Sequence, residues 1–303
     1  MPTAAVDTEL STIRDMLNED MFVSNIRRHR FEWEMACACM DMIGDALLAI
    51  DAFDGEPNSA GRAYLQVYGL FQAFFLQQHS IQSLAAALKI DGLKVGDDPD
   101  LKELRELRNK YFGHPFKHDV PKPTTYHGLT RITVTGDEIT GWTYPEFSTE
   151  TIIVSASIAK QAEGAVRVLM QLRQRLEAKR KDYILKFDGK QLPTDRRGYE
   201  FEKLYLWALQ PNDDAAALAG IAQEMLAKTL KEIKAGIQER YESSDTIRTI
   251  EKAEFCLQHM RKSIERGTRG DRFEDEIYMN ALRQAYDEIV EACVEINQVF
   301  EVA

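Results

Sequence analysis

The sequence has little of what membrane, secreted and disulfide-bonded proteins require. Only four of its 303 residues are cysteines, and their spacing fits neither a zinc site nor a disulfide framework, so we expect them to fill helical cores. Residues 1–17 lack the basic start and apolar centre of a signal peptide. The most apolar run, residues 64–88, is interrupted by glutamines and is too polar to cross a membrane. These absences predict a cytoplasmic protein with no membrane span.

Motifs for several classes of catalysis are missing as well. The sequence has no glycine-rich phosphate-binding loop, no HExxH zinc motif and no serine or cysteine nucleophile signature, and we predict neither a metal nor a cofactor. Basic residues are also scarce: 38 Lys and Arg face 49 Asp and Glu, a net charge of -11, which argues against broad nonspecific nucleic-acid binding. Residues 101–135 differ, because seven basic residues there face three acidic ones. This segment can still bind an anion, provided that its acidic side chains lie on other faces.

Hydrophobic periodicity predicts a mostly helical chain. In the first part, helical patterns cover 8–50 (one helix, or two with a break near His29), 61–88, a segment starting at Asp98 or Asp100 and ending near 113, and 155–186. Between the third and fourth helices the period changes, and alternating residues with a turn at Gly136-Asp137 predict a β-hairpin at about 129–145.

A loop rich in Gly, Pro and charge at 187–198 predicts a junction between two domains. Beyond it, helical patterns cover 199–209, 214–241, 245–266 and 272–301, which predicts an antiparallel bundle. The expected fold is therefore all-α with one small β-hairpin, as a helical N-terminal domain at 1–190 and a second helical bundle at 195–303.

The third helix ends in the unusual stretch RELRNKYFGHPF, residues 105–116. On a helical wheel its buried stripe consists of Leu104, Leu107 and Tyr111. Arg108 and His114 flank this stripe on opposite edges, about two turns apart, and are poorly placed to touch within one chain. A two-fold axis along the stripe would bring the Arg of one chain to the His of the other, and so create a composite site. Asn109 falls away from this face on the same wheel.

His114 lies between Gly113 and Pro115, where the helix is expected to stop. The exposed carbonyls of a helix end favour the charged imidazole and nearby arginines disfavour it, a balance that suits a general acid or base near neutral pH. Spacing alone leaves a structural alternative open, in which Arg108 pairs with an acid and His114 caps carbonyls.

The stretch RNKYFGH, residues 108–114, resembles the R-N-x-x-x-x-H motif of the HEPN family. The order of elements over residues 8–186 is similar too, including the β-hairpin between the motif helix and the last helix. The resemblance implies a dimeric, metal-independent endoribonuclease that leaves 2′,3′-cyclic phosphate ends, with Arg108, Asn109 and His114 as catalytic positions. Such enzymes belong to toxin-antitoxin and phage-defence systems. Phe116 stands where a related group of toxins has a modified tyrosine, so nothing supports that form of control.

Four further residues are candidates for contacts to an RNA substrate: Arg105, Lys110, His118 and His79. The expected partners are RNA, a second copy of the chain, and an antitoxin or regulatory protein. Two other interpretations stay open: a catalytically silent HEPN-like module that binds a nucleotide, RNA or protein partner, and a purely structural helical dimer.

Overall fold

A computed structural model describes residues 3–18, 30–55, 57, 59–113, 116–117, 125–134, 136–210, 212–241, 244–267 and 272–301. The chain divides into two compact units, Met1–Ala178 and Lys179–Ala303. The division falls inside the long helix α6 (Val154–Lys186), upstream of the loop at 187–198 in which the sequence analysis placed the junction. Among the helices of the described residues, none combines the length and the apolarity that a membrane span requires.

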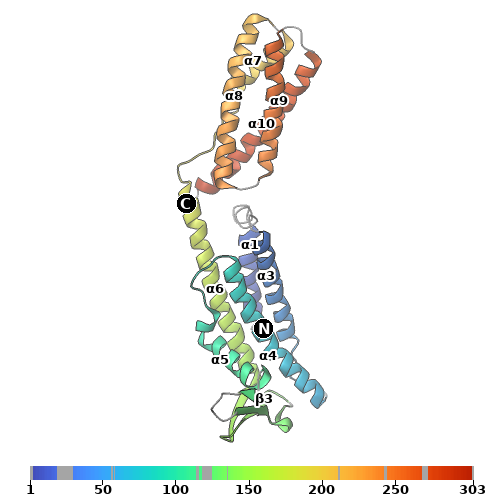
Figure 1. Cartoon of the computed structure of the whole chain (residues 1–303), viewed down its shortest axis with the longest axis vertical. Coiled ribbons are helices and arrows are strands. Elements are labelled where there is room, and N and C mark those ends of the chain that lie inside the picture. The colour runs from blue at the N-terminus through green and yellow to red at the C-terminus, as the bar shows by residue number, and fades with distance from the viewer. Residues whose placement is uncertain are drawn as a thin grey trace. The chain divides into compact units, whose positions relative to one another are not determined.

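The first unit is a helical bundle with a small sheet at one end (Figure 1). Its α-helices are α1 (Thr3–Asn18), α3 (Arg30–Asp51), α4 (Ala60–Ala87), α5 (Pro99–Leu107) and the first part of α6. Asp98, one of the two predicted caps, caps α5: its carboxylate accepts from the N–H groups of Asp100 and Leu101, both at 3.1 Å. The helical pattern at 8–50 forms two helices, α1 and α3, and the expected break near His29 lies outside the described residues.

Two apolar clusters hold this unit together. The first packs the buried stripes of α1, α3, α4 and α6 against one another, with Val6, Leu10, Ile13 and Leu17 supplying the α1 stripe at helical spacing. The second lies nearer the sheet and contains buried side chains of α3, α4, the motif segment (Arg108–Gly113) and the strands. Among them are Phe71, Phe74, Tyr111, Ile139 and Ile152. The motif segment is therefore anchored in the second cluster.

The motif does not continue α5 as an ordinary α-helix, as the wheel assumed. After Leu107 the backbone widens into a π-helical segment, η2 (Arg108–Gly113), of 6 residues. Each residue of such a segment advances through a smaller angle than in an α-helix, and π-helical turns are often found at functional sites. The angular position that the wheel assigned to Asn109 therefore does not apply, and His114 lies outside the described residues.

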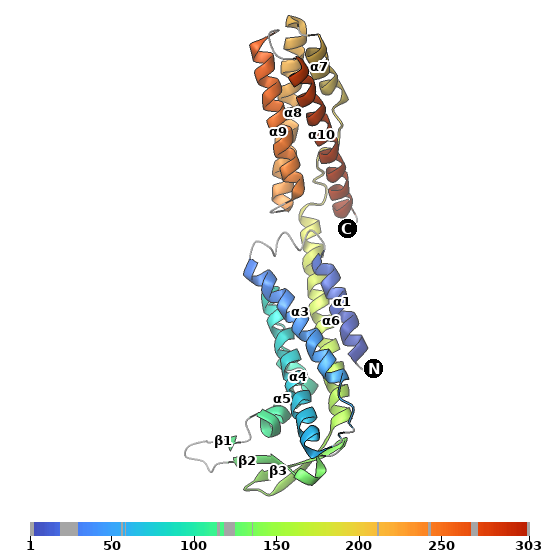
Figure 2. The ribbon, with the colours of Figure 1, turned by 90° about the vertical axis from the view of Figure 1, so that its right-hand side faces the viewer.

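The predicted hairpin at 129–145 is wrong in its pairing. One strand of that range exists, β3 (Glu138–Tyr144), but it pairs antiparallel with β2 (Thr125–Leu129) on one side and with β4 (Ser148–Ile153) on the other. The 2-residue strand β1 (Phe116–Lys117) extends the sheet beyond β2, which gives the order β1-β2-β3-β4. Figure 2 shows β1, β2 and β3 at the end of the unit.

The segment expected as the first strand of that hairpin forms a short 3-10 turn, η3 (Arg131–Thr133). The alternation of Ile132 and Val134 predicted one shared face, but Ile132 is 84% exposed and Val134 is 1% exposed. The hydroxyl of Thr133 donates to the Thr130 carbonyl at 2.8 Å and accepts from the Thr140 N–H at 2.9 Å. Threonine side chains that bond the local backbone in this way compete with strand pairing.

The second unit is a bundle of helices, as predicted. It contains α7 (Gly198–Leu209), α8 (Asp213–Arg240), α9 (Asp245–Arg266) and α10 (Arg272–Glu301), together with the last turns of α6. Asn212 and Ser244 cap α8 and α9 through bonds to the N–H groups of Ala215 and Thr246. These side-chain caps explain why the two helix starts lie close to the predicted ones.

Candidate functional site

Arg108, the first residue of η2, is held by two neutral amides and an aromatic ring. Its Nη2 donates to Gln72 Oε1 on α4 at 2.8 Å, and its Nη1 donates to Asn109 Oδ1 at 3.1 Å. The guanidinium carbon lies 4.6 Å from the centre of the Phe75 ring, a cation–π distance. The structure thus brings the side chain of Asn109 to Arg108, although the wheel had placed Asn109 on a different face.

Gly113, at the end of η2, makes room for that guanidinium group. A Cβ atom built on Gly113 would lie 2.9 Å from the guanidinium carbon of Arg108, closer than real Cβ contacts come. Since only glycine lacks a Cβ atom, this position of the motif permits the close approach of Arg108 to the backbone.

Arg105, one turn earlier, contacts the same ring. Its guanidinium carbon lies 5.9 Å from the Phe75 centre, and its Nε donates to Gln78 Oε1 at 3.1 Å. The imidazole of His79 stacks on Phe75 with a centroid distance of 6.1 Å. Phe75 is therefore the centre of a cluster of Arg105, Arg108 and His79, three residues that the sequence analysis singled out.

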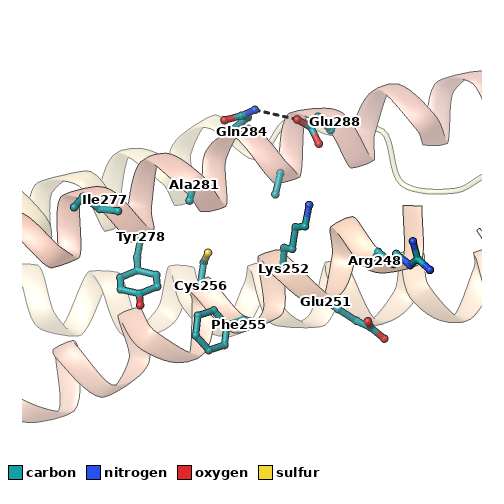
Figure 3. Close-up of a pocket in the computed structure, with 11 residues that line it drawn as sticks. Arg248, Glu251, Lys252, Phe255, Cys256, Ile277, Tyr278, Ala281, Gln284 and Glu288 are labelled. Carbon is teal, nitrogen blue, oxygen red and sulfur yellow. Dashed lines mark hydrogen bonds between the residues drawn. The ribbon is translucent and has the colours of Figure 1, made fainter. Parts of the chain in front are cut away.

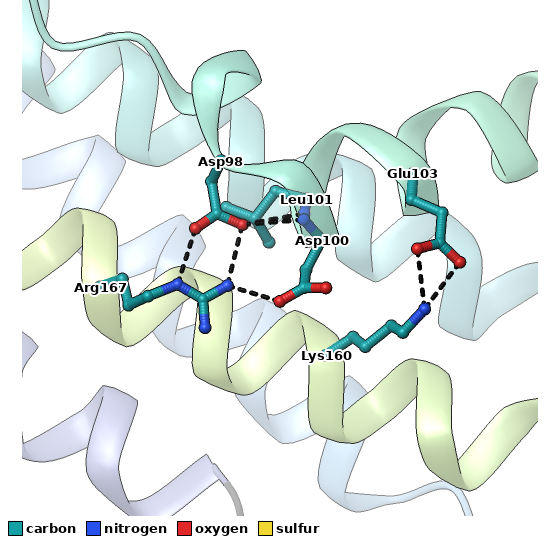
Figure 4. A network of polar contacts seen from close by, with 6 residues as sticks. All are labelled: Asp98, Asp100, Leu101, Glu103, Lys160 and Arg167. Carbon is teal, nitrogen blue, oxygen red and sulfur yellow. Dashed lines mark hydrogen bonds and ion pairs between the residues drawn. The ribbon is translucent and has the colours of Figure 1, made fainter.

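The charge of this cluster is not neutralised by the surrounding protein. Within the described part of the chain, neither Arg105 nor Arg108 has a carboxylate within 4.0 Å, and their polar partners are amides. Elsewhere in the same unit arginines pair with acids: Arg167 bonds Asp98 and Asp100 (Figure 4), and Arg173 bonds Glu9. Two guanidinium groups without a carboxylate partner have the chemistry to bind an anion, because each presents N–H donors in a fixed fork.

The hydrophobic residues of η2 fix this cluster to the bundle. Phe112 stacks on Phe71 of α4 with ring centres 4.1 Å apart, and Tyr111 is only 2% exposed. The Tyr111 ring lies so close to the backbone of Gly141 on β3 that a Cβ atom there would overlap it. Arg108 is thus presented by a segment that is packed on both α4 and the sheet.

Lys110, a predicted substrate-binding residue, is used differently. Its Nζ bonds Glu150 Oε2 on β4 at 2.7 Å, and the Tyr111 hydroxyl donates to the same oxygen at 3.0 Å. The bond from Lys110 lowers the pKa of Glu150, although burial acts in the opposite direction. Lys110 therefore carries a charge that is already paired, and it ties η2 to β4.

His127 lies on β2. Its Nδ1 is 3.0 Å from Thr143 Oγ1 on β3, and its ring meets Tyr111 edge-on at 5.9 Å. Burial, followed by the charge of Lys110, lowers the pKa of His127. His114 and His118, the two other histidines of the motif region, lie outside the described residues.

Three residues of α4 build the cluster but were not predicted from the sequence: Gln72, Phe75 and Gln78. Their spacing of three along the helix, followed by His79, was a usable signal, because residues three or four apart share a helix face. What the sequence did not contain was the register between this face and η2. Tertiary contacts set it, among them the packing of Phe112 on Phe71.

The second unit offers an open groove rather than a polar cluster. A cavity of about 710 Å³ lies between α9 and α10, and Phe255, Cys256 and Tyr278 line it (Figure 3). Its lining includes none of the predicted site residues. In the described parts of both units, no group of three or more His, Cys, Asp and Glu side chains is placed to hold a metal ion.

Comparison of the chain with protein-family models, curated proteins and solved structures finds no match.

Proposed function

We propose that this protein is a metal-independent endoribonuclease that acts at a homodimer interface, in a toxin or phage-defence setting and under an antitoxin or other regulatory protein. One observation carries the proposal: Arg105 and Arg108 converge on Phe75 and are held by amides, without a carboxylate partner in the described structure. A protein with a net charge of -11 has ample acid to neutralise two arginines. Leaving them uncompensated suits a site whose ligand brings the negative charge.

The chemistry needs an anion site and a proton carrier. In metal-free RNA cleavage the 2′-oxygen attacks phosphorus while the bond from phosphorus to the 5′-oxygen breaks, which leaves a 2′,3′-cyclic phosphate and a 5′-hydroxyl. Arg108 would hold the phosphate oxygens as negative charge builds on them, and Arg105 would bind a phosphate of the substrate. The motif resemblance assigns proton transfer to His114, which takes the 2′-hydroxyl proton or protonates the leaving oxygen.

An apolar face on α4 supports the dimer. Leu65, Tyr68 and Leu76 are 73%, 42% and 37% exposed, and they recur at helical spacing on the side of α4 that carries Gln72 and Phe75. Large apolar side chains in such a row favour a protein partner over solvent. A second copy related by a two-fold axis would cover this row and would add its own motif segment beside Arg108.

The test is cleavage of end-labelled RNA by the purified protein in EDTA. Arg108→Ala and His114→Ala are the test variants, and Arg62→Ala, which removes an exposed arginine at the start of α4, is the matched control. The expected result is cleavage by the wild type and by Arg62→Ala, with 2′,3′-cyclic phosphate ends, and its loss in both test variants. Size-exclusion chromatography checks that all four proteins have the same oligomeric state.

Two results would overturn the proposal. Cleavage that survives both substitutions would come from another site or from a contaminant. RNA binding without cleavage, if it is weakened by Arg108→Ala, would identify the alternative function, a silent module that binds an anionic ligand at the same two arginines.

A further inference from the structure

Three glutamines lie in the interior of the first unit, an unusual place for this residue type. Gln77 and Gln78 on α4 and Gln161 on α6 are 0%, 1% and 1% exposed. Burying an amide is unfavourable unless its hydrogen bonds are remade inside the protein, and an apolar side chain of similar size would fill the same space without that demand. The position of three such groups in one core therefore calls for an explanation.

The three amides form a chain that ends at the candidate site. Gln161 Nε2 donates to Gln77 Oε1 at 2.8 Å, and Gln78 Nε2 donates to Gln161 Oε1 at 2.9 Å. The outer member, Gln78, accepts from Arg105 Nε at 3.1 Å. Because arginine can only donate, it requires the oxygen of Gln78, and this sets the orientation of each amide behind it.

The inner end of the chain is incomplete. The amino group of Gln77 and the hydroxyl of Ser80, one turn apart on α4, have no hydrogen-bond partner in the described structure.

At the outer end, the bond at Nε directs the rest of Arg105. This bond and the Phe75 ring fix the plane of the guanidinium group. The two terminal nitrogens have no hydrogen-bond partner within the described residues. Two such nitrogens can donate to two oxygens of one phosphate in a bidentate contact.

We propose that Gln78 and Gln161 are positioning residues, whose buried amides hold Arg105 in the direction in which it binds a phosphate of the substrate. This inference rests on the proposed function. Gln78 acts on Arg105 directly and Gln161 acts through Gln78, so neither touches the substrate. We call the hydrogen-bonded series Gln161, Gln78 and Arg105 the relay. It connects the centre of the bundle to the candidate site.

The first test observes Arg105 itself and needs no activity. In a ¹⁵N-labelled protein, the Nε–H group of an arginine held by a fixed acceptor exchanges slowly with water and gives a resolved signal. Arg105→Lys identifies that signal. Gln78→Met and Gln161→Met, which keep side-chain length and remove the amide, are expected to weaken or shift it. Gln82→Met is the matched control, since Gln82 lies one turn further along α4 but bonds the backbone of Leu93 and Val95.

The second test measures RNA cleavage by the same variants. We expect Gln78→Met and Gln161→Met to raise KM about 3- to 10-fold, the usual effect of an anchoring side chain that must be ordered on binding. The kcat should change little, because Arg108 and His114 are untouched, and Gln82→Met should change neither constant.

The outcomes separate this inference from the proposed function. An Arg105 signal that is the same in Gln78→Met and Gln161→Met as in the wild type would overturn the relay, whatever the activity. Equal rises of KM in these variants and in Gln82→Met would also overturn it, because the effect would then be one of general stability. A signal that responds as expected in a protein that neither binds nor cleaves RNA would support the relay geometry and refute the function.

Discussion

Arginines at the two ends of α5 have different kinds of partner, carboxylates at one end and neutral amides at the other. At the start of the helix, Asp98 caps the backbone and also bonds Arg167, which bonds Asp100 as well, and Lys160 bonds Glu103 next to them (Figure 4). At its other end, Arg105 and the following Arg108 bond glutamine and asparagine amides. Figure 4 shows that the first set of contacts joins α5 to α6.

The difference separates a structural role from the binding role that we propose. Two carboxylates neutralise Arg167. Burial acts to raise the pKa of Asp98, but the bond from Arg167 and the backbone N–H groups of Leu101 and Asp100 lower it below its ordinary value. The charge of Arg167 is therefore neutralised inside the protein, and its ion pairs hold α5 against α6. Amides fix the direction of a guanidinium group but leave its charge in place, so the other end of α5 keeps its attraction for an anion.

The strongest test of this comparison substitutes one arginine from each end. Arg108→Ala should reduce the kcat of RNA cleavage by about 10²- to 10³-fold, as loss of a donor to a developing oxyanion does, and should hardly change the free energy of unfolding. Arg167→Ala should leave cleavage intact and lower the free energy of unfolding by about 1–2 kcal/mol. Cleavage assays measure kcat, and urea unfolding measures the free energy of unfolding. Equal losses of activity in the two variants would contradict the proposed difference between the two arginines.

A second test removes the carboxylate of Asp98, whose side chain is only 8% exposed. Asp98→Ala loses the cap and the ion pair and should cost about 2–3 kcal/mol, whereas Asp98→Asn keeps a capping oxygen and should cost less. Because the pKa of this carboxyl in the folded protein lies below its ordinary value of 3.8, its contribution is fully present above that value and is lost as the pH falls through the folded pKa. Urea unfolding at several acidic pH values should therefore show a smaller loss of stability for Asp98→Asn than for the wild type.

A third test gives Arg108 an acidic partner, like the partners that Arg167 has. Gln72→Glu would place a carboxylate on the Nη2 group of Arg108, at a position where the glutamine oxygen now lies 2.8 Å away. The free energy of unfolding should change by less than about 1 kcal/mol, since the pair is exposed. RNA affinity, measured by fluorescence anisotropy, should fall about 10-fold, because the new carboxylate neutralises one of the two guanidinium charges that the site offers to the RNA. Gln72→Met, which removes the bond but adds no charge, is the control, and it should weaken binding less.

The smallest effect is expected at Lys110, the basic residue of the motif that already has an acidic partner. Lys110→Met should alter RNA affinity less than 3-fold, about the effect of a partly exposed ion pair, and should lower stability slightly by freeing Glu150. Anisotropy measurements beside Arg105→Met, which removes an uncompensated charge, provide the contrast. A larger loss of affinity in Lys110→Met would place the ligand on the sheet side of η2.

Much of the helical fold could be predicted because its causes are local. Asp98 was one of two predicted caps of α5, and the α9 and α10 boundaries agree with the periodic segments 245–266 and 272–301. A cap and an apolar stripe act within a few residues, so they are readable without the rest of the chain. The strands were harder: the alternation at 129–145 correctly suggested extended structure at β3, but pairing with β2 and β4 depends on segments outside that range.

The sequence by itself determined which segments are helical, where several of them start, and that Arg105, Arg108 and His79 are worth attention. Only the tertiary structure decided that Phe75 gathers these three side chains, that Lys110 is neutralised by Glu150, and that buried amides hold Arg105. The physical reason is the range of the interactions. Helix formation follows contacts three or four residues apart, whereas the partner of a charged side chain is chosen by the packing of distant segments.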